Sequence, residues 1–361
     1  MTSMISGALR ASQLKRLSFL CGLPTTGRKD ELIARLALAN SNTSPPVVTK
    51  TKKKAKSSSS PPVVLSIDLG IKNLAFSLLT PDSKRNGRSS NSAANGLHGS
   101  ANTAPIPITL HAWRRLSLLD LGPNSDGGGG SEECSPLSAG FFAPAALAIT
   151  TNNFLQDTIL QLRPLPTHIL IERQRWRSGG AAAIQEWTVR VNTLEAMLHA
   201  SLRTLRDLGV WGGEVVPVKP ERVGQFFLLG QDQVKPEEAE AESAERPAGK
   251  RRTKKTSAES KKAKIDLMSR WLDGSDLVVS PGNVETRHML DAYIAATKRK
   301  KPRPRRSKVA DAADISEEGP IERKAKLDDL TDSLMQGIAW LRWQENTSLL
   351  NSEGGVEELL K

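Results

Sequence analysis

The sequence predicts an α/β fold in which a mixed β-sheet is flanked by helices, with a small helical hairpin in front of it. Two observations carry this prediction. Short apolar segments of strand length alternate with longer segments of helical periodicity, and the first two strand-like segments are separated by only three residues, Gly70–Lys72. Strand–helix–strand units need a right-handed crossover, which favours one mixed sheet with helices on its faces.

The expected elements follow from local patterns. Strands are expected at 63–69, 73–80, 108–116, 168–172 and 214–218. Helices are expected at 8–40 as a two-helix hairpin, and at 145–162, 181–208, 220–229, 265–272 and 327–343. The 181–208 helix is the clearest, because Trp187, Val191, Leu194 and Leu198 fall at steps of three and four.

Composition predicts that folded segments alternate with unpacked ones. Only 38% of the 361 residues are hydrophobic and 4% aromatic, which is low for a chain folded from end to end. A helical motif is expected at 1–40, a flexible basic linker at 41–62, the main domain at 63–345 and a tail at 346–361. Disordered insertions into the main domain are expected near 81–104, 121–137, 231–262 and 298–323.

The charge balance favours a polyanionic partner. The net charge is +12 and the pI about 9.8, which is typical of nucleic-acid binding, although scattered basic loops would give the same sum. Two cysteines, Cys21 and Cys134, make no disulfide framework and no CxxC metal site. No apolar run reaches the length of a membrane span. The first 29 residues are basic and without acids, which suits a mitochondrial transit peptide and a DNA-binding helix equally.

Five acidic residues stand at special positions. Asp68 ends the first predicted strand and Glu172 ends a later one. The remaining three open the last predicted helix; they are Asp328, Asp329 and Asp332. Each has a simpler explanation when taken alone: a turn residue for Asp68, an ion pair with the following arginines for Glu172, and a solvated first helical turn for the aspartates.

Taken together, these acids predict a metal site. Carboxylates from two strand ends and one helix start form an oxygen-only ligand set, which suits Mg²⁺. Two such ions about 4 Å apart support in-line cleavage of a phosphodiester bond, one acting on the attacking water and the other on the leaving oxygen. The pattern therefore indicates a nuclease.

Three motifs carry a resemblance to a known family. SIDLGIKNLAFSLL, ILIERQRWRSGG and KLDDLTDSLMQGIAWLRW, in this order, resemble the RNase H-like nuclease superfamily and, more closely, the fungal mitochondrial Holliday junction resolvases related to RuvC. The resemblance covers most of 63–345. GLPTTGRKDELIARL also resembles a SAP motif, a helical DNA-binding hairpin.

The resemblance implies the metal ligands, the substrate and the oligomeric state of the protein. It makes Asp68, Glu172 and Asp332 ligands of two Mg²⁺ ions, which Mn²⁺ can replace, with Asp328 or Asp329 as the fourth ligand. It implies a homodimer that nicks opposing strands of four-way junction DNA in the mitochondrial matrix, with no membrane and no small-molecule cofactor. The alternatives are another RNase H-like nuclease, acting on RNA–DNA hybrids or in transposition, and a non-catalytic SAP-containing DNA-binding protein.

The DNA contacts are expected around the second motif. They are Arg173, Gln174, Arg175, Trp176 and Arg177, together with Lys72 in the hairpin turn and Arg28 and Lys29 in the SAP-like segment. Guanidinium groups suit phosphate oxygens, so Arg175 and Arg177 are the strongest candidates for phosphate contacts. For Trp176, stacking on a base and packing on a neighbouring helix both stay open.

Overall fold

The computed structural model describes most of the predicted elements. The described residues are 9–41, 61–82, 103–121, 139–175, 184–228, 257–273, 278–298 and 320–361. No helix within these ranges is long and apolar enough to cross a membrane.

One six-stranded mixed sheet forms the centre of the molecule. Its strands are β1 (Val64–Asp68), β2 (Leu74–Pro81), β3 (Ile108–Leu116), β4 (His168–Glu172), β5 (Glu214–Val218) and β6 (Val279–Pro281). The order across the sheet is β5-β4-β1-β2-β3-β6. β1, β2 and β3 pair antiparallel, whereas β4 runs parallel to β1 and β5 parallel to β4. The predicted mixed sheet and its first five strands are confirmed.

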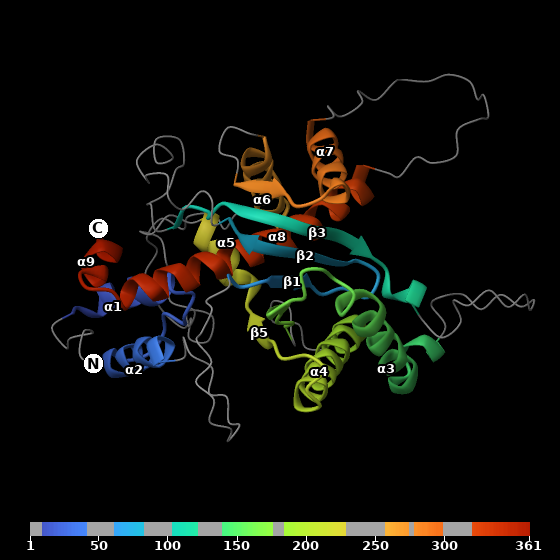
Figure 1. Ribbon diagram of the computed structural model, residues 1–361, viewed down its shortest axis with the longest axis horizontal. Coiled ribbons are helices and arrows are strands. Elements are labelled where there is room, and N and C mark those ends of the chain that lie inside the picture. Colours follow the sequence, from blue (N-terminus) through green and yellow to red (C-terminus); the bar gives the residue numbers. More distant parts are fainter. Residues whose placement is uncertain are drawn as a thin grey trace, which may run out of the picture.

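Helices cover both faces of this sheet. They are α1 (Ala11–Leu20), α2 (Lys29–Ser41), α3 (Pro144–Asn153), α4 (Glu186–Asp207), α5 (Pro220–Leu228), α6 (Ser257–Leu272), α7 (Val284–Lys298), α8 (Pro320–Leu350) and α9 (Gly355–Leu360). Figure 1 shows α3 and α4 on one side of the sheet and α6 and α7 on the other. A π-helical segment, Phe154–Ile159, continues α3.

Strand β1 separates two hydrophobic cores. Leu65 and Ile67 point into the core formed with α3 and α4, whereas Val64 belongs to the core formed with α8, α6 and α5. The side chains alternate because successive residues of a strand face opposite sides of the sheet. Ser66 and Asp68 therefore lie on the same face as Val64, toward α8.

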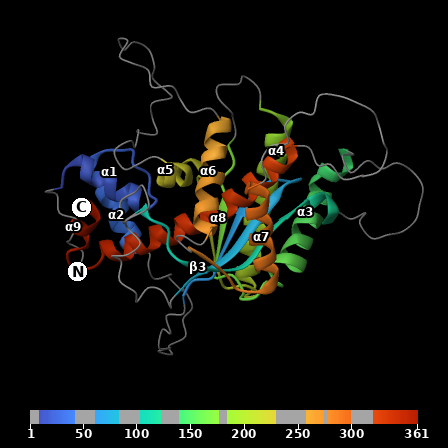
Figure 2. The same ribbon diagram turned by 90° about the horizontal axis from the view of Figure 1, so that it is seen from above.

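The two ends of the chain pack together. Leu14, Leu17 and Leu20 of α1 are fully buried in the same core as α8, and the Asn346 side-chain amide donates to the Leu20 carbonyl oxygen at 2.7 Å. Figure 2 shows α1, α2 and α9 together at the far end of α8. The segment 346–361, expected as a tail, forms the last turns of α8 and helix α9, with Leu359 buried.

Other parts of the structure also differ from the sequence-based expectations, and helix α7 is one that was not predicted. Helix α6 begins at Ser257, so its first turns lie inside the segment 231–262 that was expected to be a disordered insertion. Lysines and small residues at its start conceal its helical pattern. Strand β6 is also additional; it is only three residues long and pairs with β3 at the sheet edge, so no period-2 pattern marks it.

Candidate active site

Two acids meet at adjoining strand ends. β1 and β4 are parallel with Ile67 opposite Ile171, which makes Asp68 and Glu172 the next residues along each strand. Their side chains are hydrogen-bonded to each other. Burial raises the pKa of Asp68 well above its ordinary value, and the hydrogen bond and negative charge of Glu172 raise it further. The physical cause is the crowding of two carboxylates in one buried place.

Helix α8 brings three more acids to the same place. The charges of Asp332 and Asp329 contribute to the raised pKa of Asp68, and the charges of Asp328 and Glu172 contribute to that of Asp332. We call these five residues the carboxylate cluster; it comprises Asp68, Glu172, Asp328, Asp329 and Asp332. Burial is the largest cause that raises the pKa of Asp332, to about 6, against the opposing effect of Lys264.

Three cations face the carboxylate cluster from neighbouring elements. Lys264 Nζ of α6 binds both carboxylate oxygens of Asp332, at 2.7 and 2.8 Å. Lys261, one turn earlier, binds Asp328 at 2.7 Å, and Arg115 of β3 binds Asp329 at 3.2 Å. None of these three basic residues is predicted by the sequence patterns. Lys261 lies in the supposed insertion, and no spacing along the chain links any of the three to α8.

The carboxylate cluster fits a divalent cation in its chemistry. Among the described residues, three basic side chains form ion pairs with these five acids, so the cluster carries an excess of negative charge there. The Asp328 side chain is only 8% exposed, and its Oδ1 atom has no hydrogen-bond partner in the described part of the chain. A buried carboxylate oxygen without a donor is costly unless a cation binds it. Among the described residues, however, no three acidic, histidine or cysteine side chains are arranged as a ready metal site.

The segment after β4 lies at the edge of this site. Arg173 and Arg175 are exposed, whereas Gln174 is half-buried, as the alternation of an extended chain predicts. The backbone is held by neighbours: Arg173 N–H donates to the Val218 carbonyl at 2.8 Å, and Gln174 N–H donates to Glu195 Oε2 at 3.0 Å. Arg175 forms an ion pair with Glu221. Trp176 and Arg177 lie outside the described residues.

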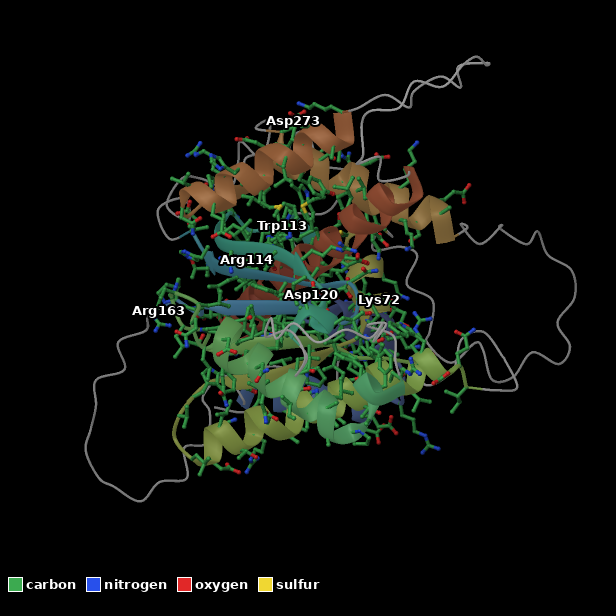
Figure 3. All side chains as sticks on the ribbon, turned by 90° about the vertical axis from the view of Figure 1, so that its right-hand side faces the viewer. Lys72, Trp113, Arg114, Asp120, Arg163 and Asp273 are labelled. Atoms are coloured by element: carbon green, nitrogen blue, oxygen red, sulfur yellow. The ribbon has the colours of Figure 1, made fainter. Side chains whose placement is uncertain are left out.

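The other predicted DNA contacts are at the surface. Lys72 is exposed in the turn between β1 and β2, which Figure 3 labels. Arg28 and Lys29 are exposed at the start of α2, at the opposite end of α8 from the carboxylate cluster. The structure therefore gives two separate basic positions, one beside the acids and one on the N-terminal hairpin.

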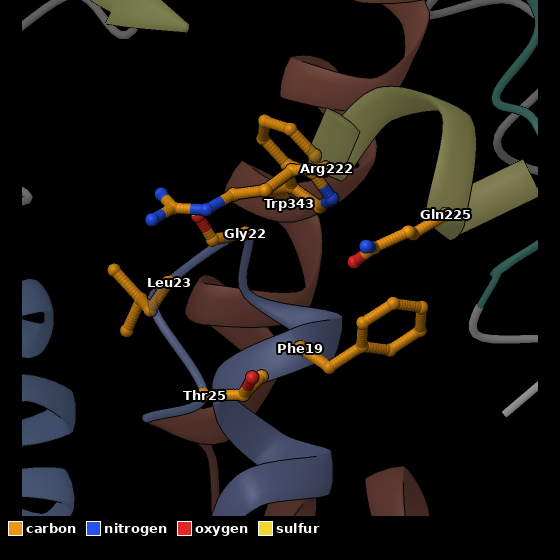
Figure 4. Close-up of a pocket in the computed structure, with 7 residues that line it drawn as sticks. All are labelled: Phe19, Gly22, Leu23, Thr25, Arg222, Gln225 and Trp343. Carbon is orange, nitrogen blue, oxygen red and sulfur yellow. Dashed lines mark hydrogen bonds between the residues drawn. The ribbon is translucent and has the colours of Figure 1, made fainter. Parts of the chain in front are cut away.

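A small hollow lies between this hairpin, α5 and α8. Figure 4 shows its lining, which comprises Phe19, Gly22, Leu23, Thr25, Arg222, Gln225 and Trp343. Trp343 is eleven residues beyond Asp332 on the same helix, which is roughly 16 Å along its axis. The hollow belongs to the packing of the hairpin and is remote from the acids.

The strand order and the acids at the central strand ends define the class of protein: an RNase H-like α/β fold with a carboxylate cluster. Residues 64–350 match the family model described as "Mitochondrial resolvase Ydc2 / RNA splicing MRS1". The chain belongs to this family. The match begins after the α1–α2 hairpin, so the SAP resemblance of that hairpin stays a prediction.

Individual relatives agree with the family match. A Schizosaccharomyces pombe protein named "Cruciform cutting endonuclease 1, mitochondrial" is 31% identical over 194 residues, which is 53% of this chain and 55% of the relative. The match thus spans about half the length of that relative. The Saccharomyces cerevisiae protein of the same name is 23% identical over 310 residues, covering 80% of this chain and 72% of that one.

A solved structure shares the fold. The crystal structure of the yeast mitochondrial Holliday junction resolvase Ydc2 is 20% identical, with a TM-score of 0.52, and the alignment covers 97% of this chain and 98% of that one. This similarity supports the RNase H-like architecture described above.

Proposed function

We propose that this protein is a Mg²⁺-dependent endonuclease that resolves four-way DNA junctions in mitochondria. The single observation that carries the proposal is the carboxylate cluster: strand ends and a distant helix bring five acids together, and the described part of the chain pairs only three basic side chains with them. Family membership and the names of both relatives, which include cruciform cutting and mitochondria, support the substrate and the location.

Asp68, Glu172 and Asp332 are proposed as metal ligands, with Asp328 as the fourth. Asp328 is favoured over Asp329 because Asp328 has a buried oxygen that receives no hydrogen bond from the described residues, whereas Arg115 already binds Asp329. When bound, Mg²⁺ supplies activation of a water and stabilisation of the leaving oxygen, and Mn²⁺ serves in its place. The protein supplies the carboxylates and holds them close despite their repulsion.

Lys261 and Lys264 are proposed to keep the acids together before the metal binds. Each ammonium group lies on one α8 aspartate, which offsets the repulsion between charges on one helix face. Lys264 is largely buried, and its pKa is raised by the charge of Asp332 against the opposing effect of burial. It therefore remains charged at neutral pH.

Arg173 and Arg175 are proposed to bind the phosphates that flank the cut. Both are exposed beside Glu172, and guanidinium groups suit phosphate oxygens. Glu221 must release Arg175 for this contact. Lys72, Gln174, Arg28 and Lys29 remain proposed DNA contacts, as do Trp176 and Arg177, and a homodimer is proposed because two equal sites match the two-fold symmetry of a junction.

A cleavage assay tests the proposal. Purified protein is incubated with Mg²⁺ and one of three substrates: a mobile four-way junction, a linear duplex or an RNA–DNA hybrid. Paired nicks in the junction are expected, with the other two substrates left largely whole. Asp68→Asn and Glu172→Gln should bind the junction but leave it uncut.

Two outcomes would favour rival functions. Better cleavage of the hybrid would indicate an RNase H-like nuclease of another specificity. Junction or RNA binding without cleavage in either metal would indicate a non-catalytic nucleic-acid-binding protein; the family description also includes RNA splicing.

A further inference from the structure

A buried polar contact joins the two elements that carry the acids. Gln336 of α8 and Ser66 of β1 are both buried. The Gln336 side-chain amide donates to Ser66 Oγ at 3.1 Å and to the Ile67 carbonyl oxygen at 3.3 Å. Around this contact the α8–β1 interface is otherwise largely apolar. The roles proposed above do not use it.

The contact lies directly behind the carboxylate cluster. Ser66 is two residues before Asp68, so both side chains are on the same face of β1. Gln336 is four residues after Asp332, so both are on the same side of α8. The Gln336 amide thus links α8 to β1 at a point two residues before Asp68 on the strand and one helical turn after Asp332 on the helix.

The helix also approaches the sheet closely here. A Cβ atom at Gly337 would lie 2.5 Å from Leu79 Cδ2 and 3.3 Å from Ser66 Cβ, so a larger residue would force the Leu79 side chain to move. Ser77, which pairs with Ser66 across β1 and β2, donates through Oγ to the Ser333 carbonyl at 3.1 Å. Apolar contacts alone are non-directional, whereas these hydrogen bonds fix how far α8 lies along β1.

We propose that Gln336 is a positioning residue that sets the spacing between Asp68 and Asp332, and hence the affinity of the site for its divalent cation. This inference rests on the proposed function. An apolar side chain of equal size would fill the same volume without fixing the register of the helix. Metal ligands need placement to within fractions of an ångström, so a small shift of α8 weakens binding even when the fold persists.

The test compares two buried amides of the same helix. Gln336→Met removes the contact behind the acids, whereas Asn346→Leu removes the hydrogen bond to Leu20 at the far end of α8. Mn²⁺ binding is measured by calorimetry on the full chain, together with melting temperature and the Mg²⁺ dependence of junction cleavage. Gln336→Met should weaken Mn²⁺ binding by about ten-fold, as the loss of a supporting residue behind a metal ligand does. Asn346→Leu should melt earlier but bind Mn²⁺ as the wild type does.

A second variant keeps the test decisive. Ser66→Ala removes one acceptor of the Gln336 amide and should weaken Mn²⁺ binding by a smaller factor; if Gln336→Met does not fold, this variant decides alone. The double variant should bind Mn²⁺ no more weakly than Gln336→Met, because both substitutions remove the same hydrogen bond between Gln336 and Ser66. Unchanged Mn²⁺ affinity in both single variants, or equal weakening by Asn346→Leu, overturns the inference. A wild-type protein that binds Mn²⁺ but leaves the junction whole instead refutes the proposed function.

Discussion

At the scale of single residues, the main distinction lies between two adjacent aspartates. Asp328 is buried beside Lys261, and one of its carboxylate oxygens has no donor within the described ranges, whereas Asp329 is held by Arg115. The charge of Asp329 nevertheless acts on Asp68, so it is not remote from the site. Asp328 and Asp329 are therefore expected to contribute unequally to junction cleavage.

Asp328→Asn should reduce junction cleavage more than Asp329→Asn does. An amide in place of a metal ligand typically removes activity by orders of magnitude, whereas Asp329→Asn removes charge near the ligands and should cost roughly ten-fold. Single-turnover cleavage at saturating Mg²⁺ measures both, and binding of the uncut junction in Ca²⁺ serves as the control. A larger loss of cleavage for Asp329→Asn would instead assign the fourth metal ligand to Asp329.

The pH dependence of stability follows from the same acids. Asp332 has a folded pKa of about 6, above its ordinary value of 3.8, and the pKa of Asp68 is also raised. The folded state thus holds protons that the unfolded state releases, so stability falls as pH rises from about 4 through 6. In EDTA, the melting temperature should decrease over this range. Mg²⁺ should remove much of the decrease at neutral pH, and Asp332→Asn should flatten it; a rising profile would contradict the assignment.

At the scale of elements, the N-terminal hairpin is packed onto the domain that carries the acids. α1 packs against α9 and the far end of α8, and Phe19 contacts Phe226, which in turn contacts Trp343. Arg222 donates to the Gly22 carbonyl at 3.3 Å, so α5 also holds the turn between α1 and α2. The hairpin therefore supports the helix whose other end bears the acids.

Leu17→Ala in α1 should destabilise the whole protein by about 2–5 kcal/mol, because Leu17 is fully buried and its truncation leaves a cavity. Leu38→Ala in α2 is the matched control, since Leu38 is 62% exposed and should change stability by about 0.5 kcal/mol or less. Chemical denaturation followed by far-UV circular dichroism measures both. Separate unfolding of the hairpin, leaving the rest intact, would show that it is an independent module.

At the scale of the whole molecule, the net charge of +12 predicts salt-sensitive DNA binding. The basic positions proposed to contact DNA range from Arg28 on the hairpin to Arg175 beside the carboxylate cluster, and both side chains are exposed. Many phosphate contacts of this kind give a linear fall of log affinity with log salt concentration.

Arg175→Ala should reduce the slope of this salt dependence by about one and should weaken junction binding at low salt. Glu221→Gln should strengthen junction binding at low salt, because it frees Arg175 from its ion pair. Fluorescence anisotropy with a catalytically inactive Asp68→Asn background measures both across a KCl series. An unchanged slope in Arg175→Ala would remove this residue from the DNA contacts.

The sequence by itself determined the first five strands of the sheet, most helices and the five acids. Short apolar runs mark β1 and β4, and Asp68 and Glu172 at the ends of these runs are visible in the sequence alone. The resemblance then pointed to the family and its fold, and the family match and the sheet confirm both.

Only the tertiary structure decided what surrounds those acids. Lys261, Lys264 and Arg115 come from α6 and β3, which are distant in sequence from α8, and Gln336 reaches β1 across 270 residues of chain. Such contacts leave no periodic trace, because periodicity records which face of an element is buried and not what it is buried against. For the same reason the hairpin could be predicted as two helices, whereas its packing on the end of α8 became visible only in three dimensions.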